Sequence, residues 1–188
     1  MLSEAAMLLL DTLVQPFVII LLLRFHAVWL RAPMRNPIGE FVMAITDFMV
    51  LPLRKKTPTL WGLDTVTLLL ALLFEVIYLS GMLWARDYPF EQFPLLALVF
   101  MGLVKLIKIS LYLLMAAVFA QVLLSWFRSQ TPVTALLEAF TSPFLLPLRR
   151  IIPPIANLDL SPLALFLILQ LILIVPLGAL EMTAARML

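Results

Sequence analysis

The residues whose side chains could do chemistry are few and widely spaced in this sequence. The carboxylates within its apolar segments, Asp11, Glu75 and Glu181, show neither HExxH spacing nor a paired acid/base arrangement. His26 is the single histidine and cysteine is absent, which excludes thiolate metal sites and thiol catalysis. With five glycines in all, the chain contains no glycine-rich phosphate loop. We therefore predict no catalytic residues, no metal site and no cofactor, and a protein that is not an enzyme.

Four polar residues interrupt the apolar segments at related positions: Arg24, Glu75, Gln121 and Gln170. Gln170 follows Glu75 by 95 residues, and Gln121 follows Arg24 by 97. Because an ionisable group in hydrocarbon is costly, such residues face protein and pair with one another. Arg24 and Glu75 differ in depth by a distance that an arginine side chain can bridge, and we hypothesise a buried ion pair between them. Such a pair would either make a helix hairpin tolerable in lipid or belong to an ion or proton pathway.

The composition places the chain in a membrane. Hydrophobic residues make up 64% of the sequence and its mean hydropathy is +1.11, whereas globular domains average about 45–50% apolar residues. The net charge is only +2, and the basic residues flank apolar segments. This distribution favours the positive-inside pattern of a membrane protein over nucleic-acid binding.

The apolar segments predict an all-α membrane protein with about four transmembrane helices and two or three short amphipathic helices. Two amphipathic segments, Ile38 to Leu51 and one that begins at Val133, are too short to span and should lie along the interface. We expect Pro52 to end the first, Pro143 or Pro147 to end the second, and Pro176 to kink the last span. Lys105 and Lys108 interrupt a long apolar run, Leu95–Phe127. We divide this run into a short helix, Leu95 to Lys108, and a span. The predicted spans are Ala5–Leu30, Thr65–Ala85, Ile109–Phe127 and Ser161–Glu181.

The chain also repeats itself. TSPFLLPLRRIIP at residues 141–153 matches TDFMVLPLRKKTP at residues 46–58 with a constant offset of 95 residues. Each copy contains a span, an amphipathic helix and another span, so the two copies point the same way as parallel tandem repeats. We predict a first repeat over residues 1–88, a connector with a short apolar helix over 89–108, and a second repeat over 109–188.

The basic residues of the repeated motif are Arg54 and Lys55 in the first copy and Arg149 and Arg150 in the second. Cations at this depth bind anionic lipid headgroups, or they dock a membrane or cytoplasmic protein partner. Lys and Arg are concentrated in the loops after the first and third spans. The positive-inside rule therefore predicts that the basic turns are cytoplasmic and that both termini lie outside.

The duplicated pattern resembles the YggT family. The second copy, LLSWFRSQTPVTALLEAFTSPFLLPLRRIIPPI, carries the closer match, whereas the first has VWL for SWF and Phe48 where the second has Pro143. The second copy in turn has Gln121 where such repeats usually have arginine. The resemblance implies a small integral protein of a bacterial inner membrane or a thylakoid. It implies roles in osmotic and ion homeostasis, division-site organisation or the assembly of membrane cytochromes.

From these observations we expect a non-enzymatic polytopic scaffold or assembly factor of the bacterial inner membrane. It would serve osmotic or ion homeostasis, or the organisation of the cell envelope and of division. The alternative is a small ion channel or transporter subunit. Because four spans enclose little room for a pore, that alternative requires a homo-oligomer. Neither function involves nucleic acid.

Overall fold

The computed structural model describes residues 2–54, 64–89, 93–126, 131–153 and 159–188, and every element within these ranges is helical. The first repeat holds α1 and a π-helical turn, η1, which run directly into α2, followed by α3 and α4. α5 comes next and begins within the predicted connector, and it is followed by α6 and a last span in two pieces, α7 and α8. The bounds are α1 Leu2–Leu9, η1 Leu10–Val14, α2 Gln15–Trp29, α3 Pro37–Arg54, α4 Thr65–Ala85, α5 Leu95–Trp126, α6 Pro132–Ile151, α7 Ser161–Ile174 and α8 Pro176–Arg186.

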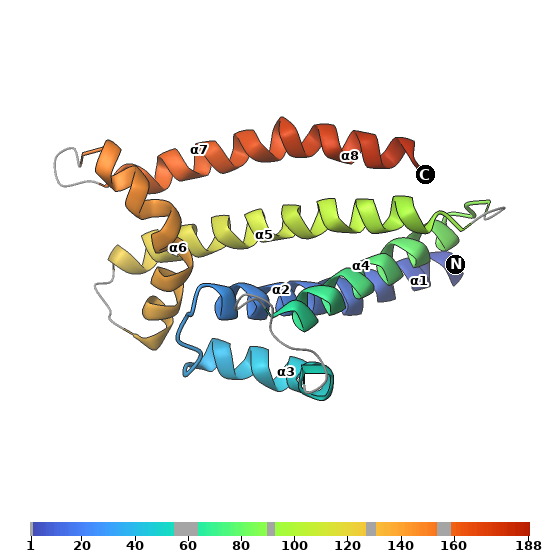
Figure 1. Cartoon of the computed structure of the whole chain (residues 1–188), viewed down its shortest axis with the longest axis horizontal. Helices are drawn as coiled ribbons and strands as arrows, with labels where there is room; N and C mark the ends of the chain where they lie inside the picture. Colours follow the sequence, from blue (N-terminus) through green and yellow to red (C-terminus); the bar gives the residue numbers. More distant parts are fainter. Residues whose placement is uncertain (1, 55–63, 90–92, 127–130, 154–158) are drawn as a thin grey trace.

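Within the part of the chain that the structure describes, four helical segments are long and apolar enough to cross a membrane, which confirms the predicted fold class. They are Leu2–Trp29, Thr65–Ala85, Leu95–Ser125 and Ser161–Ala185. Figure 1 shows α5 running between α7 and α8 on one side and α1, α2 and α4 on the other, with α6 crossing the ends of the long helices. Both termini lie at the opposite end, as an even number of spans requires. We call these two ends of the bundle the α6 end and the terminal end.

The short helices α3 and α6 are amphipathic, as predicted. α3 buries Gly39, Val42, Thr46 and Val50, and α6 buries Leu136, Phe140, Thr141 and Leu145. These residues recur every three or four positions, with Phe140 and Thr141 side by side, which places them on one face of each helix. At the start of α3 the Asn36 side chain accepts a hydrogen bond from the Gly39 N–H, whereas α6 starts with a capping box between Thr131 and Thr134.

The prolines do not end these helices, contrary to our prediction. Pro52 lies inside α3, which continues to Arg54, and both Pro143 and Pro147 lie inside α6, which continues to Ile151. All three prolines are exposed. The backbone can therefore give up a hydrogen bond on the outer face of the helix while the buried face stays packed. As a result, Arg149 and Arg150 belong to the last turn of a helix and not to a separate turn.

α5 is one continuous helix of 32 residues, so the predicted break near Lys108 is wrong. At about 1.5 Å per residue the helix is about 48 Å long, more than the roughly 30 Å of hydrocarbon in a bilayer. No proline interrupts it, and its two lysines have acidic partners on neighbouring helices, so neither has to reach the interface. The division of the chain into repeats at residues 88 and 109 stays a prediction.

Two proline effects shape the other spans. The last span is interrupted at Val175, between α7 and the start of α8 at Pro176, so the predicted kink is confirmed. The first span contains the π turn η1, which sequence reasoning missed. There the Gln15 N–H donates to the Leu10 carbonyl, five residues back, immediately before Pro16, which has no N–H to donate.

Candidate functional site

A buried polar cluster at the α6 end of the first repeat joins α2, α3 and the start of α4. Arg24 of α2 is 5% exposed, and its Nη1 donates to Thr46 Oγ1 and to Asp47 Oδ1, both at 2.6 Å. Its Nε lies 3.9 Å from Oδ2 of Asp64. Asp64 also caps α4 by accepting from the Thr67 N–H. One guanidinium therefore fixes α3 against two spans.

The second repeat contains a neutral version of the same contact. Thr141 of α6 donates its hydroxyl hydrogen to Gln121 Oε1 of α5. Thr46 and Thr141 are equivalent in the repeat, as are Arg24 and Gln121. Asparagine, glutamine and threonine side chains can hold membrane helices together through such interhelical bonds. Arg24 and Gln121, the predicted repeat equivalents, therefore each bond the amphipathic helix of their own repeat to a span.

The basic residues of the repeated motif lie at the ends of α3 and α6. Arg149 and Arg150 are exposed in the last turn of α6, where cations interact favourably with the helix dipole, while Arg54 is half-buried at the end of α3. Arg149 Nε lies 2.8 Å from Asp159 Oδ2, so this arginine is held against the start of α7. Lys55 lies outside the described residues.

Asp159 links the end of α6 to the first turn of α7. Its Oδ1 accepts from the Ser161 N–H at 2.9 Å. Burial raises the pKa of this carboxyl, but the hydrogen bonds from Ser161 and the charge of Arg149 outweigh that effect and hold the pKa below its ordinary value of 3.8. Asp159 therefore stays charged at neutral pH and keeps Arg149 in place.

A second polar cluster lies around Glu75, midway along α4. Glu75 is fully buried, Gln15 Nε2 donates to its Oε2 at 3.1 Å, and Lys105 Nζ of α5 lies 3.4 Å from its Oε1. The predicted ion pair between Arg24 and Glu75 is therefore wrong. Arg24 turns toward the carboxylates of α3 and of the α4 cap, which lie at its own depth, and Lys105 supplies the cation for Glu75.

The Glu75 cluster extends toward the terminal end. Lys105 Nζ also lies 4.6 Å from the centroid of the Tyr78 ring, and the Tyr78 hydroxyl donates to Asp11 Oδ1 at 2.8 Å. Lys108, one helical turn from Lys105 on α5, pairs with Glu181 of α8 at 2.6 Å. Sequence reasoning missed both lysine pairs. The rule that an intramembrane cation needs an acidic partner could have found them, because Glu75 and Glu181 lie in the neighbouring spans.

Gln170, the repeat equivalent of Glu75, has no comparable setting. It lies on the exposed side of α7, whereas Glu75 is fully buried between α2 and α5. The difference follows from the packing, since α4 packs closely against both α2 and α5 while α7 packs against α5, α6 and α8. The Glu75 cluster therefore belongs to the first repeat and its contact with α5.

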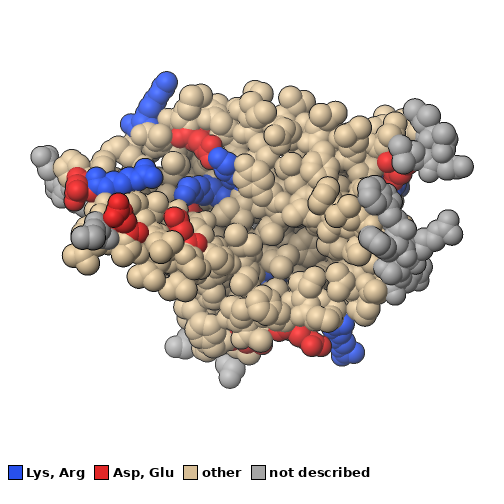
Figure 2. All heavy atoms as spheres, turned by 180° about the vertical axis from the view of Figure 1, so that it is seen from behind, with Lys and Arg blue, Asp and Glu red and all other residues tan. Residues whose placement is uncertain are grey.

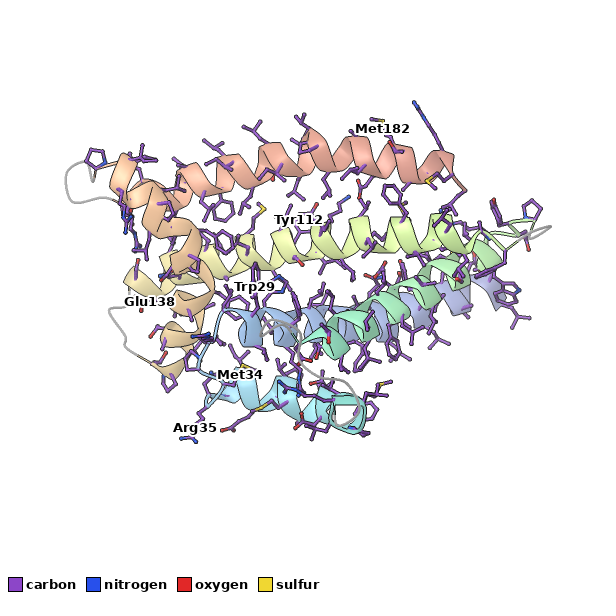
Figure 3. All side chains as sticks on the ribbon, in the orientation of Figure 1. Trp29, Met34, Arg35, Tyr112, Glu138 and Met182 are labelled. Atoms are coloured by element: carbon purple, nitrogen blue, oxygen red, sulfur yellow. The ribbon has the colours of Figure 1, made fainter. Side chains whose placement is uncertain are left out.

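An apolar groove of about 580 Å³ lies between α2, α5, α6 and α7. Trp29 at the end of α2 (Figure 3) and Phe140 of α6 line its α6 end, and His26 lies there with its ring 6.5 Å from that of Phe140. His26 Nδ1 is 2.7 Å from the Leu22 carbonyl oxygen, within its own helix. Among the described residues no group of three His, Cys, Asp or Glu side chains could hold a metal ion.

The duplicated arrangement of span, amphipathic helix and span can be compared with known families. The model of the CCB3/YggT family matches residues 3–84 and 100–180, one segment for each repeat. The chain belongs to the CCB3/YggT family. The two matched segments fit tandem repeats, and together they cover most of the chain.

Relatives from several bacteria are similar over most of their length. The chain is 32% identical to a protein of Pseudomonas aeruginosa over 91% of this chain and 87% of the relative. It is 31% identical to a Vibrio alginolyticus protein from the proC 3' region, over 86% and 88%. It is 27% identical to the YggT protein of Escherichia coli K12, over 87% and 85%. No solved structure matches the chain.

Proposed function

We propose that the protein is a non-enzymatic scaffold or assembly factor of the bacterial inner membrane, in which the end of α6 docks an acidic segment of a partner protein. The observation that carries this proposal is the fixed basic end of α6. Arg149 and Arg150 are exposed beside Ile151, which is 76% exposed. Two cations next to an exposed aliphatic side chain form a surface suited to an acidic, partly apolar partner.

The contacts that hold α6 support a positioning role. Thr141 is bonded to Gln121 of α5, and Arg149 is bonded to Asp159 at the start of α7. The basic end is therefore anchored to two different spans, and a partner would meet it in one orientation. Pre-organised groups of this kind lose little conformational entropy on binding. In this role the protein would face the cytoplasm with its basic ends and serve osmotic or ion homeostasis, or organise the cell envelope and division.

A site-specific crosslink tests this proposal. A photoreactive residue in place of Ile151 should capture the same partner protein in repeated experiments in living cells, and the Arg149→Ala/Arg150→Ala variant should lose that product. Arg186→Ala, which removes a cation at the terminal end of α8, is the matched control and should leave it unchanged. Crosslinks to lipid alone would show an anionic-lipid anchor instead and would contradict partner docking.

The physiological part of the proposal has its own test. Cells that lack the protein should recover more slowly from an osmotic shift, and the Arg149→Ala/Arg150→Ala variant should fail to restore recovery while Arg186→Ala restores it. Recovery that is equal for both variants would separate the osmotic role from the basic end of α6.

A second candidate function, a small ion-transport subunit that acts as a homo-oligomer, is favoured by the fully buried Glu75 and its partner Lys105. Intramembrane ionisable residues commonly mark ion or proton paths. Purified protein that carries an ion flux in liposomes, with loss of the flux in Glu75→Gln, would support this function over the scaffold.

A further inference from the structure

Glu75 lies at the centre of the membrane. It is the eleventh of the 21 residues of α4, which run from Thr65 to Ala85. The carboxyl group is therefore about 15 Å from either end of the helix, close to the midplane of a hydrocarbon core about 30 Å thick. A carboxyl group in this position can exchange a proton with water only along a polar route through the protein.

On the side of Glu75 that faces the terminal end, polar groups continue. Lys105 Nζ lies between the Glu75 carboxylate, at 3.4 Å, and the Tyr78 ring, at 4.6 Å. Tyr78 lies one turn beyond Glu75 on α4, and its hydroxyl donates a hydrogen bond to Asp11. Asp11 is exposed and lies in the π turn η1, a helix distortion that is frequent at functional sites. These residues lead from the buried carboxyl to the protein surface at the level of Tyr78, seven residues before the terminal end of α4.

On the side of Glu75 that faces the α6 end, the packing is apolar. Seven apolar residues, 68–74, separate Thr67 from Glu75 on α4, a length of about 12 Å. Eight apolar residues, 16–23, separate Gln15 from Arg24 on the adjacent α2. A cluster of side chains, each at most 6% exposed, fills this region, and we call it the apolar plug: Val18, Leu21, Leu22, Val50, Val66, Leu70, Ala71 and Leu106.

The charged groups around Glu75 follow the same division. α5 contributes Lys105, α2 contributes the neutral Gln15, and η1 contributes Asp11 through Tyr78. Lys108 lies one turn nearer the α6 end on α5, where it is paired with Glu181 of α8. Arg24 and its carboxylate partners lie beyond the apolar plug. Figure 2 shows acidic and basic side chains gathered near the terminal end and reaching partway along that face, an uncharged expanse in its middle, and further charged side chains along its lower edge and at the α6 end.

We propose that Glu75 is a proton-binding carboxyl that exchanges its proton with water at the terminal end of the bundle, by way of Asp11 and Tyr78, while the apolar plug closes the route from the α6 end. One proton taken up from that side converts the carboxylate beside the Lys105 ammonium into a carboxylic acid, and the same proton returns to that side on release. The inference does not rest on the scaffold proposal, because it concerns the other half of the membrane and requires no net flux.

The test measures protonation of Glu75 with the pH set separately on the two sides of a vesicle. The full-length protein is reconstituted in phospholipid vesicles and treated with a hydrophobic carbodiimide, which reacts with protonated carboxyl groups in membranes. Modification of Glu75 is quantified by mass spectrometry, with Glu75→Gln as the assignment control. Because the chain has no cysteine, Ile151→Cys and an impermeant maleimide report which way the protein is inserted.

The modification rate should rise as the pH falls on the terminal side, by up to about tenfold per pH unit, since the protonated fraction of a single group changes by that factor. Changing the pH on the α6 side should have little effect. Tyr78→Phe keeps the ring under Lys105 but removes the hydroxyl, and it should slow the modification several-fold. Tyr112→Phe, a change at a half-exposed tyrosine of α5 (Figure 3), is the matched control and should leave the rate unchanged.

A further variant opens the closed side. Ala71→Ser places a hydroxyl one turn from Glu75 within the apolar plug and should make the modification rate respond to the pH on the α6 side. Thermal unfolding in detergent checks that each variant is folded. The proposal is overturned if the unmodified sequence responds equally to both sides or only to the α6 side. It is equally overturned if Glu75 is modified at a rate independent of pH, or at no pH at all.

Discussion

In the second repeat Thr141 donates its hydroxyl hydrogen to Gln121, whereas the equivalent Thr46 of the first repeat accepts a hydrogen bond from Arg24. Thr46 donates its own hydroxyl hydrogen to the Val42 carbonyl four residues earlier. Thr141 shares its one hydroxyl hydrogen between Gln121 and the Leu137 carbonyl, also four residues earlier. The geometry of the junction is therefore shared, whereas its charge is not. A neutral pair suffices in the second repeat because the acidic residue equivalent to Asp64, Asp159, has its own cation in Arg149.

Replacement of Arg24 by glutamine should destabilise the protein strongly. The change leaves the carboxylates of Asp47 and Asp64 without their cation, and Asp64 is fully buried. Removal of one partner from a buried charged cluster typically costs about 3–5 kcal/mol. Denaturant unfolding in detergent measures the loss in the free energy of unfolding.

The control for this change lies in the second repeat. Gln121→Ala removes one neutral hydrogen bond and should cost about 1 kcal/mol. Adding Asp64→Asn to Arg24→Gln keeps an N-cap for α4 but removes the unpaired charge, so it should recover a large part of the stability. Equal losses for Arg24→Gln and Gln121→Ala would show that the charge at this junction is unimportant.

The repeat and the four spans could be predicted because they depend on local composition and on the constant spacing of 95 residues. The caps at Asn36 and Asp64 could be predicted for the same reason, since a cap acts within three residues. The ends of α3 and α6 could not, because the prolines were assumed to stop a helix. Whether a helix continues through a proline depends on which face the proline occupies and on what packs against the opposite face.

The partner of Arg24 was mispredicted for a related reason. Counting residues gives the depth of a side chain but not the direction in which it points around the helix axis. Asp47 is not among the residues that α3 buries, yet α3 lies close enough against α2 for Arg24 to reach it. The cation for Glu75 lies on α5, in the segment predicted to be a separate short helix. That division hides the pair, whereas a search for an acidic partner of each lysine would find it.

The Arg149–Asp159 contact should make the start of α7 sensitive to acid. The pKa of Asp159 is lowered in the folded protein, so its contribution to stability is fully present above the ordinary value of 3.8 and is lost as the pH falls through the lower folded value. The protection factor of the Ser161 amide, which compares its exchange rate with the intrinsic rate at the same pH, should therefore fall on acidification within this window. Asp159→Asn should abolish the pH dependence of this protection factor, and an unchanged dependence in this variant would assign the effect to another carboxyl.

The Lys108–Glu181 pair should contribute less to stability than the Arg24 cluster. Both side chains are about one-third exposed, and their charged atoms are 2.6 Å apart. Glu181→Gln leaves a lysine without its partner inside the span and should lower the free energy of unfolding by about 1–3 kcal/mol. The double variant Lys108→Met/Glu181→Met should be as stable as the original sequence or more so, because apolar residues of similar size replace ion pairs well in a low-dielectric setting. A double variant less stable than Glu181→Gln would contradict this account.

Gly39, at the start of α3, should tolerate substitution poorly. A methyl group added there would lie 2.3 Å from the Met34 carbonyl oxygen, so the backbone before the helix would have to move. That movement would also disturb the cap formed by Asn36, and we expect Gly39→Ala to cost at least about 1–3 kcal/mol.

The matched control is Gly178→Ala in α8, where the added carbon would lie 3.8 Å from the Leu173 carbonyl oxygen, an ordinary contact. Alanine there should be neutral or stabilising by up to about 1 kcal/mol, because it favours the helix more than glycine. Thermal unfolding of the two variants side by side separates the effects, and equal shifts would show that the approach of the backbone at Met34 does not limit the position.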